Sequence, residues 1–265
     1  MNPGWLETSF AVADVARTSA FYEALGLHVV ETNDAGKSRT LEAGECRIAL
    51  YEGVLDPAEA QLIFWQGDVE GCAQKLIEAG AQIVRRGGRL AEHDRGDGLV
   101  HTPDGAVAIM ARDPDGQLIL LIREPGVTRA SPPAPGSSLD RGFCQVSLPV
   151  KDPGRTAAFY ELLGFRRRAN DDPRVAPLTN GECRICLYQG YLDPDELQLN
   201  FWQGDIDAVA ATARRAGLRF YREPGRDDAG AGFMLTDPDG RPVFFINMAK
   251  YSAADFISAT GEMLA

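Results

Sequence analysis

The alternation of apolar and polar residues predicts a β-strand over residues 6–12, near the start of the chain. Asp14 then fits the N-cap of a helix that ends at Gly26. The residues that follow alternate again and predict three short strands, at 27–32, 38–43 and 46–51. The opening of the chain therefore reads as a strand, a helix and three strands.

The same order of elements is predicted three more times. The second stretch has a strand at 61–66, a helix at 69–79 and strands at 82–86, 106–112 and 117–123. The second half has strands and helices at 145–150, 153–164, 198–203 and 206–216, with further strands up to Tyr188 and up to Met248. Four β-α-β-β-β units result, and paired units would curl their sheets into half-open cups lined by alternate residues.

Long sequence matches show that the second half is a copy of the first. The segment 17–26 returns 138 positions later at 155–164, whereas the Asp-Pro-Asp-Gly turn at 113–116 returns only 124 positions later, at 237–240. The fall in spacing predicts extra residues in the first copy, at 89–105. The predicted organisation is a first domain at 1–123, a Pro/Gly/Ser-rich linker at 124–140, a second domain at 141–250 and a tail at 251–265.

Composition narrows the possible functions. The net charge of −11 and pI near 4.8 argue against nucleic-acid binding. No apolar run is long enough to span a membrane, and the first residues lack the pattern of a signal peptide. Five cysteines without a C-x-x-C fit free thiols, and with them we expect a cytoplasmic protein. A small molecule is the expected partner.

Repeated motifs of the chain resemble the vicinal oxygen chelate superfamily. They are the helix motif Val12-x-Asp14 … Phe21-Tyr22 … Leu25-Gly26, its copy at 150–164 and both Asp-Pro-Asp-Gly turns. This superfamily includes glyoxalases, bleomycin-resistance proteins and extradiol dioxygenases. The resemblance covers the whole chain except the linker and the tail. It implies an α+β fold of two tandem domains, each made of paired β-α-β-β-β units.

The resemblance also implies where a metal would bind. Enzymes of the superfamily hold a divalent metal with His, Gln or Glu in the opening strands and Glu in the closing strands. Carried over, the opening positions are Glu7, Gln61, Gln145 and Gln198. The closing and middle positions are Leu120, Phe244, Ala49 and Cys186. Cross-pairing of units would place Glu7 with Gln198 in one cup, and Gln145 with Gln61 in the other. Because the carboxylate half is missing, we expect no catalytic metal or other cofactor. A divalent metal at Glu7 and Gln198 is the alternative.

Several residues are candidates for ligand binding. Trp65 and Trp202 share strand parity with Gln61 and Gln198, so each is either an aromatic wall of a cup or part of the core. Arginines and tyrosines share one face of the middle strands: Arg47, Tyr51, Arg184 and Tyr188. An inward arginine needs a carboxylate partner, either Glu7 or a ligand, whereas an arginine at a strand end would reach solvent.

Three further features have two interpretations each. Glu7 is either a general base in an apolar cup or an exposed residue at the frayed start of the chain. Cys186 is a buried inert thiol or a nucleophile. The segment 89–105 is a solvated loop with its own turn or a lid over one cup. For the tail we expect a short helix packed onto a sheet.

These observations favour a small-molecule-binding protein in the style of the bleomycin-resistance branch, without a catalytic metal and with an apolar or aromatic ligand. The candidate ligand-binding residues are Glu7, Arg47, Tyr51, Gln61, Trp65, Gln145, Arg184, Tyr188, Gln198 and Trp202. The alternative is a glyoxalase-, epimerase- or dioxygenase-like lyase or isomerase with Glu7 as base. A third possibility is an interaction module whose cups are filled with side chains. The duplication makes a monomer plausible, and a homodimer is also possible.

Overall fold

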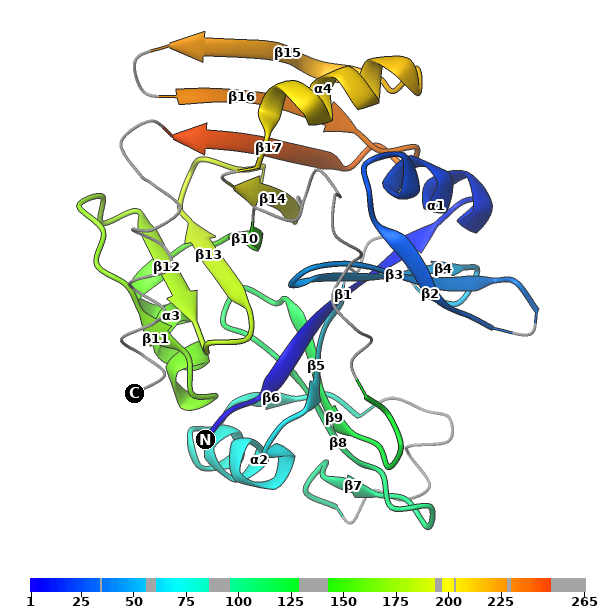
Figure 1. Ribbon diagram of the computed structural model, residues 1–265. Helices are drawn as coiled ribbons and strands as arrows, with labels where there is room; N and C mark the ends of the chain where they lie inside the picture. Colours follow the sequence, from blue (N-terminus) through cyan, green and yellow to red (C-terminus); the bar gives the residue numbers. More distant parts are fainter. Residues whose placement is uncertain are drawn as a thin grey trace. The chain divides into compact units, whose positions relative to one another are not determined.

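The structure, a computed structural model, confirms the α+β class (Figure 1). It describes residues 1–33, 35–55, 61–85, 96–128, 143–193, 197–202, 204–227 and 230–248. The linker positions 129–142 and the tail from 249 onward lie outside these residues. The four helices predicted outside the tail and nearly every predicted strand are present within two or three residues of their expected bounds. The helix expected in the tail lies outside the described residues.

The first copy forms a nine-stranded sheet in the order β2-β3-β4-β1-β5-β9-β8-β6, with β7 paired to β8. Its elements are β1 (Gly4–Val12), α1 (Val15–Ala24), β2 (His28–Thr32), β3 (Ser38–Ala43), β4 (Cys46–Glu52), β5 (Gln61–Gln66), α2 (Val69–Glu78), β6 (Gln82–Ile83), β7 (Val100–His101), β8 (Val107–Arg112) and β9 (Leu118–Arg123).

The second copy repeats this order in an eight-stranded sheet, β11-β12-β13-β10-β14-β17-β16-β15. Its elements are β10 (Phe143–Pro149), α3 (Pro153–Leu162), β11 (Arg166–Arg167), β12 (Val175–Thr179), β13 (Arg184–Tyr188), β14 (Gln198–Trp202), α4 (Ile206–Arg215), β15 (Phe220–Asp227), β16 (Gly230–Thr236) and β17 (Pro242–Met248).

The four helices begin and end in the same way, which explains why their bounds were readable from the sequence. Each starts after an aspartate whose side chain accepts a hydrogen bond from a backbone N–H of the first turn. Each is followed by a glycine with positive φ, the conformation that commonly terminates a helix. The aspartates are Asp14, Asp68, Asp152 and Asp205, and the glycines are Gly26, Gly80, Gly164 and Gly217.

The compact units of the fold draw on both copies of the sequence. The first unit contains the described residues of 1–9, 58–129 and 149–195, and the second contains those of 10–57, 130–148 and 196–265. Each unit therefore combines the second β-α-β-β-β module of one copy with the helix and the last three strands of the first module of the other copy. The opening strands are exchanged, since most of β1 belongs to the first unit and most of β10 to the second.

Within the second unit, the Asp-Pro-Asp-Gly turn of one copy binds the first helix of the other. The Tyr22 hydroxyl donates to Asp237 Oδ2 at 3.2 Å, and Thr18 Oγ1 donates to Asp239 Oδ2 at 2.6 Å. Tyr22 is fully buried. Burial, followed by the nearby Asp237 carboxylate, raises the pKa of the Tyr22 hydroxyl.

The first unit repeats this interlock with the roles of the copies exchanged. The Tyr160 hydroxyl donates to Asp113 Oδ2 at 3.1 Å, and Thr156 Oγ1 donates to Asp115 Oδ2 at 2.5 Å. Burial raises the pKa of the Asp113 carboxyl to about 6, although its hydrogen bonds act in the opposite direction. The repeated turns thus have a structural role in joining the copies.

The predicted extra segment is partly described. Residues 96–105 include β7, which pairs with β8 through His101 and Val107. The Thr102 N–H donates to Ala106 O at 2.9 Å, so the segment has its own turn, as expected. Residues 86–95 lie outside the described residues, so the expectation that this segment forms a lid is not tested.

Candidate functional site

Glu7 is buried rather than exposed at the start of the chain. Strand β1 already begins at Gly4, and the Glu7 side chain is only 2% exposed. The expectation of a frayed, exposed position is therefore wrong, because pairing with β5 covers this end of the chain. Ser9 Oγ donates to Glu7 Oε1 at 3.4 Å. Across the sheet, Ile63 and then Leu120 lie directly opposite Glu7 on β5 and β9.

The face of the first unit that carries Glu7 is well packed. Trp5 lies opposite Trp65, and their rings stack with centroids 5.6 Å apart. Ile63, Ala108 and Ile122 form a buried cluster against which Trp65 packs. Gln61, two residues before Ile63, is also buried. In this unit the tryptophan therefore contributes to packing.

Arg47 is also buried, at 7% exposure, so the expectation that it reaches solvent is wrong. The register of β3 and β4 places it opposite Glu42, which is 2% exposed. Arg47 Nη1 donates to Glu42 Oε1 at 2.5 Å, and its Nη2 lies 3.6 Å from Glu31 Oε2. Arg47 therefore has the carboxylate partner that a buried guanidinium requires, and the partner comes from the neighbouring strand.

The remaining candidates of the middle strands are placed as follows. Tyr51 is half-buried near the end of β4, opposite Ser38. Arg184 and Tyr188 are half-buried on β13, on the same face as Cys186. Burial raises the pKa of the Cys186 thiol to about 12, which suits an inert thiol.

All five cysteines are free of disulfides. No helix of the described residues is long and apolar enough to cross a membrane.

The second unit has a more open face, across five neighbouring strands. Residues directly opposite one another on these strands form two rows on this face. The first, the polar row, runs Arg222, Met234, Phe244, Asn200, Gln145 from β15 to β10. Side chains at its β10 end are buried, whereas Phe244 and Met234 are partly exposed and Arg222 is exposed.

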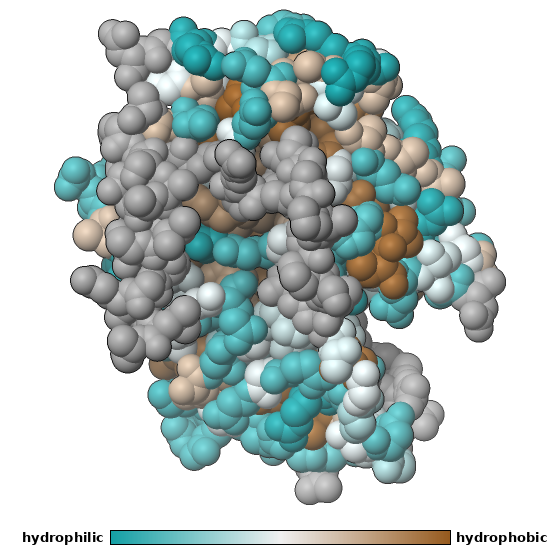
Figure 2. All heavy atoms as spheres, in the orientation of Figure 1, coloured by the Kyte–Doolittle hydropathy of each residue, from teal (hydrophilic) through white to brown (hydrophobic). Residues whose placement is uncertain are grey.

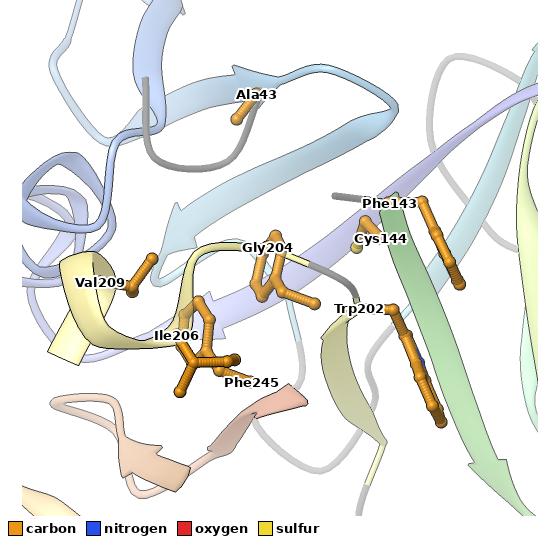
Figure 3. A pocket seen from close by; sticks show the side chains of 9 residues that line it. Ala43, Phe143, Cys144, Trp202, Gly204, Ile206, Val209 and Phe245 are labelled. Carbon is orange, nitrogen blue, oxygen red and sulfur yellow. The ribbon is translucent and has the colours of Figure 1, made fainter. Parts of the chain in front are cut away.

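The second row, the glycine row, lies beside the first. It runs Gly225, Gly232, Ile246, Trp202, Phe143 across the same five strands. Trp202 and Phe143 stack with centroids 6.1 Å apart and planes 4° apart (Figure 3). The two glycines add no side chains to the face, and a Cβ built on Gly225 would meet no heavy atom within 4 Å. The row is thus aromatic at one end and open at the other.

Near the β10 end of the two rows, two buried polar atoms have no hydrogen-bond partner among the described residues. Ser147 Oγ accepts from Asn200 Nδ2 at 2.8 Å and from Gln145 Nε2 at 3.3 Å. Gln198 lies opposite Ser147 and is buried. The register therefore places Asn200, and not Gln198, between Gln145 and Phe244. In the described part of the chain, the buried Asn200 Oδ1 and Trp202 Nε1 atoms have no hydrogen-bond partner.

A pocket opens on the β15 side of this face. It has a volume of about 320 Å³, near the lower end of the range for small-molecule sites. The lining residues are Arg222, Gly225, Arg226, Gly230, Ala231, Gly232, Phe244, Ile246, Asn247 and Met248. We call it the β15–β17 pocket. A second cavity, beside Trp202 and Phe143 (Figure 3), has about 10 Å³ and could hold at most about one water.

The resemblance would place Glu7 with Gln198 and Gln145 with Gln61, but the members of each pair belong to different units. The side chains that the strand register brings together instead do not fit a divalent transition metal. In the second unit, the row offers two neutral amides, Gln145 and Asn200, followed by Phe244. In the first unit it offers one carboxylate, Glu7, followed by Ile63 and Leu120. Such ions favour imidazole, thiolate or carboxylate ligands. No group of three His, Cys, Asp or Glu side chains that could hold a metal occurs among the described residues.

Comparison with known families supports the fold. The sequence pattern of the Glyoxalase/Bleomycin resistance protein/Dioxygenase superfamily matches residues 5–121 and 142–244. These two segments correspond to the two copies in the chain. No curated protein matches the sequence.

Solved structures of two enzyme types are similar. The Mn(II)-bound glyoxalase from Novosphingobium aromaticivorans is 16% identical with a TM-score of 0.63, covering 92% of this chain and 80% of that one. The 2,2',3-trihydroxybiphenyl 1,2-dioxygenase from Sphingomonas wittichii strain RW1 is 18% identical with a TM-score of 0.59, covering 93% and 90%. An extradiol ring-cleaving dioxygenase from B. fuscum is 20% identical with a TM-score of 0.62, covering 94% and 72%. At these identities the similarity shows the fold alone.

Proposed function

Since this chain belongs to the Glyoxalase/Bleomycin resistance protein/Dioxygenase superfamily, we propose that it binds a small, partly apolar molecule on the open face of its second unit. The β15–β17 pocket carries this proposal. Its floor is formed by Phe244, Ile246 and Met248, which are only partly buried. Exposed apolar side chains gathered in a concave site are typical of a ligand site.

Two unpartnered polar atoms beside the pocket support the proposal. Asn200 Oδ1 requires a donor, and Trp202 Nε1 requires an acceptor. A buried polar atom without a partner costs about 1–3 kcal/mol, so a ligand that satisfies these atoms gains free energy on binding. A molecule with a flat apolar body and one polar group matches Trp202, Asn200 and the pocket floor together.

The proposed binding is confined to the second unit. At the equivalent row of the first unit, Ile63 and Leu120 stand where the second unit has Asn200 and Phe244. Ala108 stands where the second unit has Gly232, and it is buried in the apolar cluster. In this proposal the first unit has a structural role and binds no ligand.

The proposed function needs no metal, since the donor sets of both rows lack the ligands that a transition metal prefers. The role is sequestration or transport of the ligand. The five free cysteines fit a reducing compartment, and we propose a cytoplasmic location. Because one chain supplies all the strands and helices of each unit, we propose that it acts as a monomer.

The test is isothermal titration calorimetry with 2-naphthylmethanol, a neutral and planar probe. Gly225→Val adds a side chain that extends into the open part of the pocket, and no positive φ opposes the substitution. We expect the probe to bind the wild type and to bind Gly225→Val at least about tenfold more weakly. Thermal unfolding of the variant serves as the control for folding. Equal binding to both proteins, or no binding to the wild type, would contradict the proposal.

A further inference from the structure

Arg222 is an exposed cation at the edge of the β15–β17 pocket. Among the described residues, no carboxylate forms an ion pair with it. The other arginines of this region differ. Arg226 Nη2 lies 2.9 Å from Asp207 Oδ2, and Arg214 Nη2 lies 2.9 Å from Glu223 Oε2.

Each of these two ion pairs joins α4 to β15. Asp207 lies in the first turn of α4, and Arg214 lies in its last turn. The part of the surface that α4 and β15 occupy is largely hydrophilic (Figure 2). Charges on this side therefore neutralise one another in exposed pairs, which contribute little to stability.

A break in strand register turns Arg222 to the opposite side. Phe220 lies opposite Leu235 on β16, but Arg222 lies opposite Met234. Leu235 is fully buried on the α4 side, whereas Met234 belongs to the polar row. The strand has therefore gained one residue between Phe220 and Arg222, and such a bulge re-aims the side chain that follows it. Without the bulge, Arg222 would face α4.

From these observations we propose that the ligand of the second unit is an aromatic monocarboxylate and that Arg222 binds its carboxylate. The inference rests on the proposed function and specifies the chemical class of the ligand. An arginine fork matches a carboxylate with two parallel hydrogen bonds. A phosphate would need several cations or a glycine-rich backbone nest, and the pocket offers one unpaired arginine.

The dimensions of the face suit an aromatic body. Neighbouring strands are about 4.8 Å apart, so Arg222 and Phe244, two strands apart, are separated by about 10 Å across the sheet. A carboxylate at the guanidinium then places an attached ring above Phe244 and Ile246. Gly225 and Gly232 keep the neighbouring strip free of side chains, which suits a flat ring.

The experiment measures the affinities of three probes by calorimetry. They are 2-naphthoate, the neutral 2-naphthylmethanol of similar shape, and decanoate, an unbranched aliphatic carboxylate. We expect 2-naphthoate to bind wild-type protein about tenfold more tightly than the alcohol, the effect of about one charge-assisted interaction at a partly exposed site. We also expect it to bind more tightly than decanoate.

Arg222→Gln and Arg214→Gln form the matched pair of variants. Both remove one positive charge from the second unit, but Arg214 lies on α4, pairs with Glu223 and is not among the residues that line the pocket. Arg222→Gln is expected to abolish the preference for 2-naphthoate over the alcohol, and Arg214→Gln is expected to retain it. Equal affinities of the two probes for wild type, or a preference that survives Arg222→Gln, would overturn the inference.

The outcomes distinguish this inference from the proposed function. If both naphthalene probes bind with equal affinity and Gly225→Val weakens both, the pocket binds ligands but the carboxylate assignment fails. If neither probe binds wild type, both proposals fail. Tighter binding of decanoate than of 2-naphthoate would overturn the aromatic part of the assignment.

Discussion

Replacing Arg47 with methionine tests the buried ion pair of the second unit most directly. In the wild type, Arg47 Nη1 lies 2.5 Å from Glu42 Oε1, and both side chains are buried between β3 and β4. Methionine has a similar length and fills much of the same space, but it carries no charge. The substitution therefore leaves the Glu42 carboxylate buried without its charged partner.

The expected cost is about 3–5 kcal/mol of unfolding free energy, the usual loss when one partner of a buried ion pair is removed. Most of this cost is the penalty of the remaining buried charge rather than the attraction lost. Glu31, the second contact of Arg47, is 71% exposed and adds little. The double variant Glu42→Leu/Arg47→Met removes both charges and should regain most of the loss.

Urea unfolding followed by circular dichroism measures the difference. Arg226→Met is the control, because it removes an arginine from an exposed pair with Asp207 and should cost less than about 1 kcal/mol. The reasoning is refuted if Arg47→Met is no more destabilising than Arg226→Met. It is also refuted if the double variant is as unstable as the single one, since the cost would then come from packing.

Two further predictions concern the first unit. The pKa of the Asp113 carboxyl is raised to about 6 in the folded protein, so between about pH 4 and pH 6 the folded state holds a proton that the unfolded state has lost. The stability that this proton contributes is fully present below about pH 4 and is lost as the pH rises through 6, so the wild type should lose about 1–2 kcal/mol of unfolding free energy between pH 5 and pH 8 relative to Asp113→Asn. The same change of unfolding free energy with pH in both proteins would argue against the raised pKa. Gly4→Ala should cost at least about 2 kcal/mol, because φ is +92° and a Cβ would lie 1.8 Å from Trp65 O. Gly116→Ala, with φ of +95° and open space, should cost about 1 kcal/mol by thermal unfolding, and equal losses would show that the crowding at Gly4 does not matter.

The elements of the fold could be predicted from the sequence because local signals mark their ends. The helix predicted at 153–164 is α3, Pro153–Leu162, which starts after the Asp152 cap and is followed closely by Gly164. The strand predicted at 61–66 is β5 without any change of bounds. In these cases periodicity and capping act within a few residues, so no tertiary information was needed.

The candidate site depends on pairing between strands, which the sequence pattern does not encode. The resemblance implied a pairing of Glu7 with Gln198, but the register of β1 and β5 puts Ile63 opposite Glu7, and the register of β10 and β14 puts Asn200 opposite Gln145. Asn200 could have been noticed only through its shared parity with Trp202. Arg222 had no signal at all, because its orientation depends on a bulge in β15.

The interleaving of the two copies has a consequence for how the chain is made. The second unit needs residues 10–57 and also β14 to β17, which are synthesised much later. At about 5–20 residues per second, roughly 7–28 s separate the synthesis of Pro57 from that of Glu196. During this interval α1 cannot form its bonds to Asp237 and Asp239. The second unit can therefore complete its folding only after β17 has been synthesised, and substitutions that weaken the early segment should lower the yield of folded protein.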